Sequence, residues 1–295
     1  MVLLRSLLFV PAARERMIET ATRSAADAVI LDLEDAVAPE LKTAGRALAR
    51  ASIGVLRAAG KTAMVRVNGI DSGLTRDDVM GVAVEGLDAV VLPKVQAPQE
   101  LRDLDVLLRE AEMMHGVRPG TVRVLPIVES ARAVLACEAI AQAIDRLVGL
   151  AIGGEDYTAD IGVERDADGL ALQHIRGVVV QVATAYGLTP IDAPYIDFKD
   201  EGGLERDAQV ARAMGLKGKF VIHPDQVATV NGVFAPNARE VARAERIIAA
   251  YEAREDGAGS ISVDGRMVDA PVIERARAVL AAASELTSKR APRQR

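Results

Sequence analysis

Short apolar runs alternate with longer segments of helical period along this chain, and this alternation restricts its fold more than any other feature. The runs are rich in Val, Ile and Leu. Most of them lack the alternation of apolar and polar residues that is typical of a strand with one solvent-exposed face. We predict buried strands over Leu3–Val10, Ala28–Leu33, Ala63–Val67, Ala89–Leu92, Val122–Val128, Leu147–Ile152, Thr189–Ile191 and Lys219–Ile222. Runs of this kind are typical of a parallel sheet that is buried on both faces.

The segments between the runs have the spacing of amphipathic helices. We predict helices over Pro39–Ala58, Pro98–Met114, Ser130–Ile144, Gly169–Tyr186 and Leu204–Met214. Pro39 and Pro98 stand near first helical positions, where a missing N–H has no cost, and Ser130 is expected to be an N-cap.

About eight strand–helix units fit a closed (β/α)8 TIM barrel, a fold of typically ~250 residues. A doubly wound open sheet is the alternative. We expect the barrel to occupy residues 1–235, and a C-terminal helical extension to occupy residues 236–295. The extension is predicted to contain a helix over 237–254, a polar stretch over 255–265 and a final helix from Pro271, and to pack on or reach into a neighbouring subunit.

Composition excludes several classes of protein. The 295 residues contain 36 Lys and Arg against 42 Asp and Glu, and aromatic residues make up only 3%, so we expect no nucleic-acid surface. The single Cys137 excludes an intramolecular disulfide and a Cys-rich zinc site, and we expect it to be buried. No apolar stretch reaches the roughly 20 residues that span a bilayer, so we expect a cytoplasmic protein without membrane contact.

Polar residues directly follow several predicted strands, at the end where a TIM barrel carries its active site. In strand order they include Glu34, Asp35, Arg66, Lys94, Glu129 and Asp156. Carboxylates that crowd into a low-dielectric cleft repel one another unless a cation lies among them. Because the available ligands are oxygens, without Cys or His at these strand ends, the sequence predicts Mg²⁺, or Mn²⁺, rather than Zn²⁺.

Glu129 and Asp156, on neighbouring strands, are the predicted metal ligands, and Glu34 and Asp35 are expected to contact the ion through water. The alternative is that these acids merely cap the helices that follow. Lys94 could form a Schiff base in a metal-independent aldolase, but we favour a salt bridge within the group of carboxylates.

Six motifs that occur in order carry a family resemblance. They are Arg5–Ala12 (RSLLFVPA), Leu31–Val37 (LDLEDAV), Val65–Gly69 (VRVNG), Val91–Lys94 (VLPK), Pro126–Ser130 (PIVES) and Gly153–Tyr157 (GGEDY). As a set they resemble the citrate lyase beta-subunit-like (CitE-like) group of the HpcH/HpaI aldolase superfamily. The resemblance implies a TIM barrel with a C-terminal extension, assembly as trimers or hexamers, and Mg²⁺-dependent chemistry on a carbon–carbon bond between an acetyl thioester and a 2-oxo acid.

The resemblance also implies roles for individual residues. Glu129 and Asp156 match the metal ligands of the family, and Arg66 matches an arginine that contacts the substrate carboxylate or thioester oxygen. The segment from Asp264 to Pro271 resembles a C-terminal motif whose Asp acts in the active site of an adjacent subunit. Asp269 therefore becomes the candidate acid/base.

Other residues are expected near the substrate. Gly153 and Gly154 could bind the keto-acid carboxylate through their backbone N–H groups, since glycine lets a ligand approach the main chain closely. Lys94 is also assigned to substrate binding. His223 follows the last predicted strand, where we expect a structural role or proximity to CoA. Arg14, after the first strand, could contact CoA phosphates or simply begin a solvated helix.

The expected activity is the reversible cleavage of a 3-hydroxyacyl-CoA, of the citramalyl-CoA or malyl-CoA type, to acetyl-CoA and a 2-oxo acid. One alternative is a citrate lyase beta subunit that acts on a citryl thioester held by an acyl-carrier partner. Another is a non-catalytic barrel that binds a CoA metabolite. A free-acid pyruvate aldolase would need no CoA and would leave the motif around Asp269 unexplained.

Overall fold

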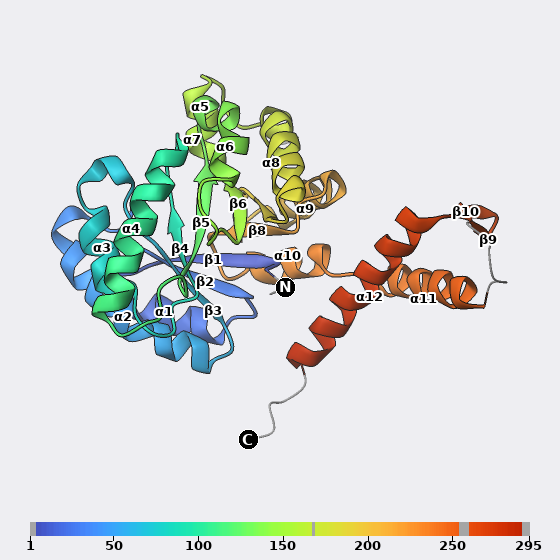
Figure 1. Cartoon of the computed structure of the whole chain (residues 1–295), viewed down its shortest axis with the longest axis horizontal. Helices are drawn as coiled ribbons and strands as arrows, with labels where there is room; N and C mark the ends of the chain where they lie inside the picture. Colours follow the sequence, from blue (N-terminus) through green and yellow to red (C-terminus); the bar gives the residue numbers. More distant parts are fainter. Residues whose placement is uncertain (1–3, 167–168, 254–259, 291–295) are drawn as a thin grey trace. The chain divides into compact units, whose positions relative to one another are not determined.

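The computed structural model describes residues 4–166, 169–253 and 260–290, which form two compact units, one of them Leu4–Phe234 and the other beginning at Ala235. In the first unit eight parallel strands close into a barrel in the order β1 to β8 (Figure 1). The TIM-barrel prediction is confirmed, and the open-sheet alternative is wrong. The strands are β1 (Ser6–Pro11), β2 (Ala28–Asp32), β3 (Thr62–Arg66), β4 (Ala89–Leu92), β5 (Arg123–Val128), β6 (Gly149–Ile152), β7 (Thr189–Asp192) and β8 (Gly218–Val221).

Closure of the barrel is visible in the register of β1. Leu7 pairs with Ala28 of β2 on one side and with Phe220 of β8 on the other. Side chains alternate along each strand between two apolar clusters. The smaller cluster, which includes Leu7, Ile30 and Phe220, fills the barrel, and the larger one lies between the strands and the helices. This alternation decides which residues at the strand ends face the barrel mouth.

Helices follow the strands around the barrel (Figure 1). They are α1 (Glu15–Arg23), α2 (Lys42–Ala58), α3 (Thr75–Val82), α4 (Pro98–Met114), α5 (Ala131–Leu135), α6 (Cys137–Ala141), α7 (Gly154–Asp160), α8 (Gln173–Ala185), α9 (Glu201–Met214) and α10 (Gln226–Phe234). Pro98 begins α4 as predicted, whereas Pro39 begins a 3₁₀ turn, Pro39–Leu41, that leads into α2. Ser130 is the predicted N-cap, since its hydroxyl accepts the N–H of Ala133 at 3.1 Å.

The single helix predicted over Ser130–Ile144 is wrong. It is two short helices, α5 and α6, that meet at Ala136. Periodicity shows which face of a helix is apolar, but it does not show a one-residue interruption of the helix within an Ala-rich stretch. Cys137 is buried as predicted, and burial raises the pKa of its thiol to about 11.

In its described residues, the C-terminal unit forms two helices and a hairpin. Helix α11 (Ala238–Glu252) begins with a capping box formed by Asn237 and Glu240. Strands β9 (Ile261–Val263) and β10 (Arg266–Val268) pair antiparallel, and α12 (Ala270–Arg290) follows. The predicted polar stretch over 255–265 misses this hairpin, and its first residues, to 259, lie outside the described residues.

A two-residue Asp-Gly turn joins β9 to β10. Asp264 and Gly265 have φ values of 53° and 72°, the left-handed pair that a type I′ turn requires. The Asp-Gly signal could therefore have predicted this hairpin. Among the residues that the structure describes, no helix is long and apolar enough to cross a membrane.

Candidate active site

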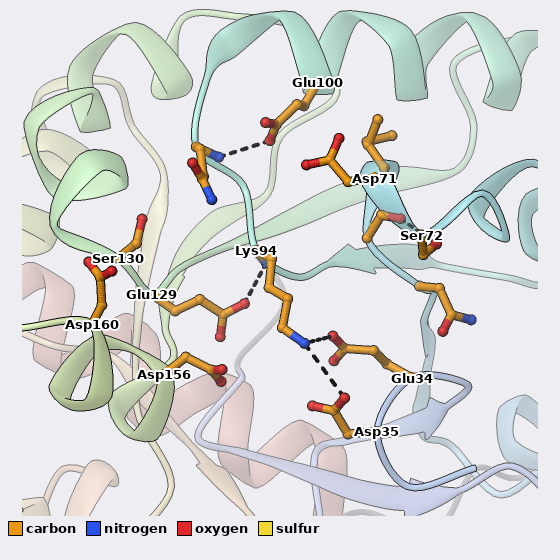
Figure 2. A pocket seen from close by; sticks show the side chains of 14 residues that line it. Glu34, Asp35, Asp71, Ser72, Lys94, Glu100, Glu129, Ser130, Asp156 and Asp160 are labelled. Carbon is orange, nitrogen blue, oxygen red and sulfur yellow. Dashed lines mark hydrogen bonds and ion pairs between the residues drawn. The ribbon is translucent and has the colours of Figure 1, made fainter. Parts of the chain in front are cut away.

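A cavity of about 550 Å³ opens at the carboxyl ends of β2 to β6 (Figure 2). It is lined by Glu34, Asp35, Asn68, Gly69, Ile70, Asp71, Ser72, Lys94, Gln96, Glu100, Glu129, Ser130, Asp156 and Asp160. Five of the predicted site residues are in this set, whereas Arg66, Gly153 and Gly154 do not line the cavity. The carboxyl ends of these strands therefore bring most of the candidate residues together, as predicted.

Glu129 and Asp156 lie next to each other in this cavity (Figure 2). Glu129 directly follows β5, and Asp156 is in the first turn of α7, which follows β6. Burial of the Glu129 side chain, together with the negative charge of Asp156, raises the pKa of Glu129 to about 8. The two carboxylates are thus crowded enough that a shared proton or cation would relieve their repulsion.

Gly153 makes room for the Glu129 side chain. A Cβ at position 153 would lie 2.5 Å from the Glu129 Cβ and closer still to Oε2. Any side chain there would displace the carboxylate. The N–H of Gly153 donates to the Val128 carbonyl at 3.0 Å, and the expected binding of a keto acid by backbone N–H groups near Gly153 stays a prediction. Gly154 is the first residue of α7, and its predicted contact with substrate stays a prediction.

Lys94 connects two of the carboxylates. Its backbone has a φ of 56°, which is strained for a residue other than glycine, and its N–H donates to Glu129 Oε1. Its Nζ lies 2.6 Å from Glu34 Oε1 and 3.6 Å from Asp35 Oδ1 (Figure 2). Burial acts to lower the pKa of Lys94, but the hydrogen bond to Glu34 outweighs burial and raises this pKa above its ordinary value. A Schiff-base lysine needs the opposite shift, so the salt-bridge alternative is the one that this geometry supports.

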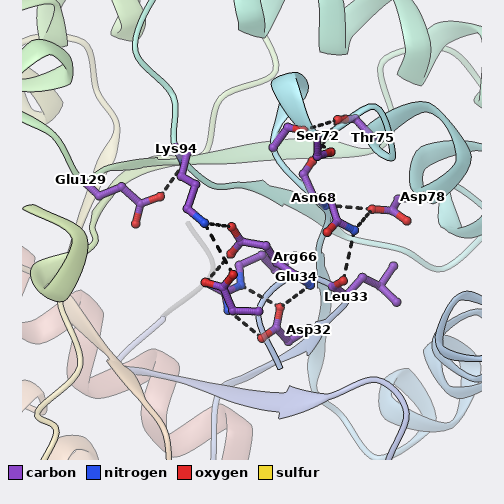
Figure 3. A network of polar contacts seen from close by, with 12 residues as sticks. Asp32, Leu33, Glu34, Arg66, Asn68, Ser72, Thr75, Asp78, Lys94 and Glu129 are labelled. Atoms are coloured by element: carbon purple, nitrogen blue, oxygen red, sulfur yellow. Dashed lines mark hydrogen bonds and ion pairs between the residues drawn. The ribbon is translucent and has the colours of Figure 1, made fainter. Parts of the chain in front are cut away.

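Arg66 ends β3 and is held by two carboxylates (Figure 3). Its Nε and Nη2 donate to Asp32 at 2.8 and 2.6 Å, and its Nη1 lies 2.9 Å from Glu34 Oε2. The guanidinium also lies 4.7 Å from the centre of the Phe9 ring. Burial raises the pKa of Glu34, while Arg66 and Lys94 act to lower it. Arg66 is thus fixed at the inner end of the mouth.

Asp32 was not among the predicted site residues, although it shapes the position of Arg66. It ends β2 and pairs in register with Arg66 of β3. Ile30 fills the barrel interior, so strand alternation places Asp32 on the same inner face. Alternation identifies Asp32 only once an inward-facing residue of β2 is known, and the apolar run by itself does not show which residues face inward.

Lys42 was also not predicted to contribute to the site. Its buried Nζ donates to the carbonyls of Leu33 and Glu34 at 2.6 and 2.7 Å, and to Asn68 Oδ1 at 2.9 Å. Asn68 in turn donates to Asp78 Oδ2 at 2.5 Å (Figure 3). These contacts fix the turn after β2 to the turn after β3, and the first of these turns carries Glu34 and Asp35.

The donor set fits a magnesium ion. Within the described part of the chain, no three His, Cys, Asp or Glu side chains are placed to hold a metal ion by themselves. Mg²⁺ commonly takes one or two carboxylates and completes its shell with water and substrate oxygens. Glu129 and Asp156 supply such a pair, and the space that Gly153 leaves against Glu129 keeps that carboxylate in the cavity. The roles of Glu34 and Asp35 toward the ion stay predictions, since both lie near Lys94 Nζ.

Asp269 belongs to the C-terminal unit. It lies between β10 and α12, is partly exposed, and its backbone carbonyl accepts the N–H groups of Val272 and Ile273. This position, directly before a helix, is that of an N-cap residue, and the acid/base role stays a prediction.

Residues 5–224 match the family model described as HpcH/HpaI aldolase/citrate lyase. The chain belongs to this family. Over 277 residues it is 35% identical to the citrate lyase subunit beta of Leuconostoc mesenteroides, with 94% of this chain and 92% of that one covered. Over 288 residues it is 36% identical to a (3S)-malyl-CoA thioesterase of Cereibacter sphaeroides, with 97% of each covered. Membership of the HpcH/HpaI family makes the protein an enzyme of the carbon–carbon lyase type.

A solved structure agrees with this assignment to the HpcH/HpaI family. The CitE protein of Mycobacterium tuberculosis, crystallised with magnesium, acetoacetate and coenzyme A, aligns with a TM-score of 0.75 and 32% identity over 95% of this chain and 98% of that one. A Burkholderia xenovorans citrate lyase aligns with a TM-score of 0.84 at 19% identity, over 99% of this chain and 95% of that one, and supports the fold alone.

Proposed function

We propose that the protein is a Mg²⁺-dependent CoA-ester lyase that reversibly cleaves a 3-hydroxyacyl-CoA, of the citramalyl-CoA or malyl-CoA type, to acetyl-CoA and a 2-oxo acid. The observation that carries the proposal is the pair of crowded carboxylates, Glu129 and Asp156, in a cavity at the barrel mouth. The magnesium and coenzyme A bound to the related CitE protein also support it.

Each residue has a distinct task in this proposal. Glu129 and Asp156 hold the ion, and bound Mg²⁺ would stabilise negative charge that develops on substrate oxygens. Arg66, which Asp32 fixes in place, keeps a permanent positive charge that favours the thioester enolate left by bond cleavage. Asp269, from an adjacent subunit, delivers a proton to the enolate carbon and removes one in the condensation direction.

The charges around the cavity favour a 2-oxo acid with one carboxylate. Among the described residues, seven Asp and Glu side chains line the cavity, and Lys94 is the one cation that does so. Lys94 pairs with Glu34 and Asp35, and Arg66 pairs with Asp32 and Glu34. A second substrate carboxylate would therefore meet cations that are already paired. We infer that pyruvate or glyoxylate is preferred over oxaloacetate.

Two other activities have support from named relatives. The identity to a citrate lyase subunit beta supports cleavage of a citryl thioester in a complex with an acyl-carrier partner. The identity to a (3S)-malyl-CoA thioesterase supports hydrolysis of the thioester without cleavage of a carbon–carbon bond. The three activities release different products, so one assay separates them.

The test is to incubate purified protein with Mg²⁺, acetyl-CoA and pyruvate, glyoxylate or oxaloacetate, and to detect the condensed thioester by mass. We expect product with pyruvate or glyoxylate, and none with EDTA or in Glu129→Ala. Glu155→Gln is the matched control, because Glu155 is adjacent to Asp156 in sequence but its exposed side chain pairs with Arg165. Product in the presence of EDTA contradicts the proposal. Release of free CoA from a malyl thioester without acetyl-CoA supports the thioesterase instead.

A further inference from the structure

Helix α7, which carries Asp156, ends in a second acid that the proposed function does not use. Asp160 is the last residue of α7, and it lines the same cavity as Asp156. Because the two acids are four residues apart, they lie on one face of the helix. Figure 2 shows Asp160 beside Ser130, the residue that follows Glu129. Asp160 thus lies where the two segments that carry the predicted metal ligands meet.

The position of Asp160 is unfavourable within its own helix. Its negative charge lies at the carboxyl end of α7, which is the negative end of the helix dipole. Two like charges four residues apart on a helix also repel each other. In the described part of the chain, no Lys or Arg forms an ion pair with this carboxylate. A residue that breaks the local rules in this way is expected to have a compensating contact or a function.

The compensating contact is a hydrogen bond to the segment after β5. The N–H of Ala131 donates to Asp160 Oδ2 at 2.7 Å. Ala131 begins α5, where a backbone N–H has no partner within the helix, and the Ser130 hydroxyl already accepts the N–H of Ala133. A carboxylate acceptor makes such a bond roughly twice as strong as a neutral one. Asp160 therefore ties the end of α7 to the backbone two residues after Glu129.

The start of α7 is tied to the same strand by a different bond. The N–H of Gly153 donates to the Val128 carbonyl at 3.0 Å, which fixes the point where α7 begins. Tyr157 packs α7 against the apolar core, but apolar packing has no preferred direction. The bond at Asp160 adds a directional contact at the other end of the helix. Asp156 lies between the two ties, so together they set how far its carboxylate is from β5.

We propose that Asp160 is a positioning residue that sets the separation of Glu129 and Asp156 for a divalent cation. It acts by accepting the N–H of Ala131, and it contacts neither the ion nor the substrate. Loss of a group that orients metal ligands typically lowers metal affinity by roughly 10- to 100-fold. The inference rests on the proposed function, because it assumes that Glu129 and Asp156 hold the ion.

The test separates the geometry of Asp160 from its charge. Asp160→Asn loses the charge but keeps an oxygen that can accept the N–H of Ala131, whereas Asp160→Ala loses both. In a titration with Mn²⁺ followed by electron paramagnetic resonance, we expect the affinity to fall roughly 10-fold in Asp160→Ala and to stay within about twofold in Asp160→Asn. Glu164→Ala is the matched control, since it removes an exposed acid from the segment after α7. Asp160 is itself exposed, so every variant should fold, which circular dichroism checks.

The outcomes separate this inference from the proposed function. If the unmutated protein binds Mn²⁺ and Asp160→Ala binds it equally well, Asp160 does not position the ligands. If Asp160→Asn loses as much affinity as Asp160→Ala, the charge near the ion is what matters, and the positioning role is wrong. If the unmutated protein binds no Mn²⁺, the metal site of the proposed function is wrong, and this inference is wrong with it.

Discussion

Gly153 shows how one absent side chain shapes this site. Glu129 occupies the space that a Cβ at position 153 would fill, and the strained Lys94 backbone directs its N–H at the same carboxylate. Glu129 follows β5, and it is therefore positioned by the backbone that follows the two flanking strands, β4 and β6. Charge alone would not fix its direction.

Replacement of Gly153 by alanine should weaken metal binding while leaving the barrel folded. The new methyl group would push the Glu129 carboxylate out of its position, so we expect the affinity for Mn²⁺ to fall at least about tenfold, since a buried carboxylate ligand is lost. Calorimetry measures the affinity. Gly177→Ala in α8 is the control, because a Cβ there meets nothing within 4 Å. Unchanged Mn²⁺ affinity in Gly153→Ala would show that Glu129 is not held in this way.

The pH dependence of metal binding should follow Glu129. Burial and Asp156 raise the pKa of Glu129 to about 8, so in the metal-free protein this carboxyl is mostly protonated at pH 7. A metal ligand must lose its proton, so apparent affinity should rise by about tenfold per pH unit below pH 8 and level off above it. Calorimetry from pH 6 to 9 measures this slope, and Glu129→Gln should flatten it. An affinity independent of pH in the unmutated protein would contradict the assignment.

At this scale the sequence predicts which acids share the cavity better than it predicts the residues that position them. Glu129 follows its apolar run directly and Asp156 lies in the turn after the next run, so both were expected at the barrel mouth, while their role as metal ligands stays a prediction. The roles of Asp32 and Gly153 could not be predicted, because a run that is apolar on both faces does not reveal which of its residues point inward.

At the scale of secondary-structure elements, a buried ionic cluster joins the strands β7 and β8 to the helices α8 and α9. Arg176 of α8 contacts Asp192 of β7 at 2.9 Å and Asp207 of α9 at 2.6 Å, and Lys219 of β8 contacts the same two carboxylates at 2.5 and 2.6 Å. All four side chains are at most 4% exposed. Two cations and two anions balance, so each depends on its partners.

Loss of one acid from this cluster should destabilise the fold. Burial acts to raise the pKa of the Asp207 carboxyl. The positive charges of Lys219 and Arg176 outweigh burial and lower this pKa from the ordinary 3.8 to about 2. A lowered pKa contributes stability above pH 4, about 2 kcal/mol here, and this contribution is lost as pH falls from 4 toward 2. Asp207→Asn leaves buried cations short of a partner, and we expect it to cost about 3–5 kcal/mol at pH 7.

Urea unfolding at pH 7 and at several lower pH values measures both effects. Glu205→Gln, an exposed change on the same helix, is the control and should alter the free energy of unfolding by less than about 0.5 kcal/mol. Equal stability of Asp207→Asn and the control would mean that the cluster does not stabilise the barrel.

The sequence predicted the strands and helices that carry the ionic cluster. It did not predict which charged residues pair, because pairing between elements depends on tertiary structure and the periodicity of the sequence does not show it.

At the scale of the whole molecule, the proposal combines residues from the barrel with Asp269 from the C-terminal unit, supplied by a second subunit in a trimer or hexamer. Asp269→Asn should retain CoA binding and slow turnover by on the order of 10²-fold or more, the usual scale for a positioned acid/base. Mixing it with Glu129→Ala should restore part of the activity, since the hybrid contains intact sites. Absence of recovery after subunit exchange would indicate a site built within one chain.

The central claim is that Glu129 and Asp156, from neighbouring strands, share one divalent cation. Titration of the protein with Mn²⁺, followed by electron paramagnetic resonance, tests it without reference to turnover. We predict one site in the unmutated protein and in Glu155→Gln, and an affinity at least about tenfold lower in both Glu129→Gln and Asp156→Asn, since each change removes a ligand. Unmutated affinity in either acid variant would contradict the claim.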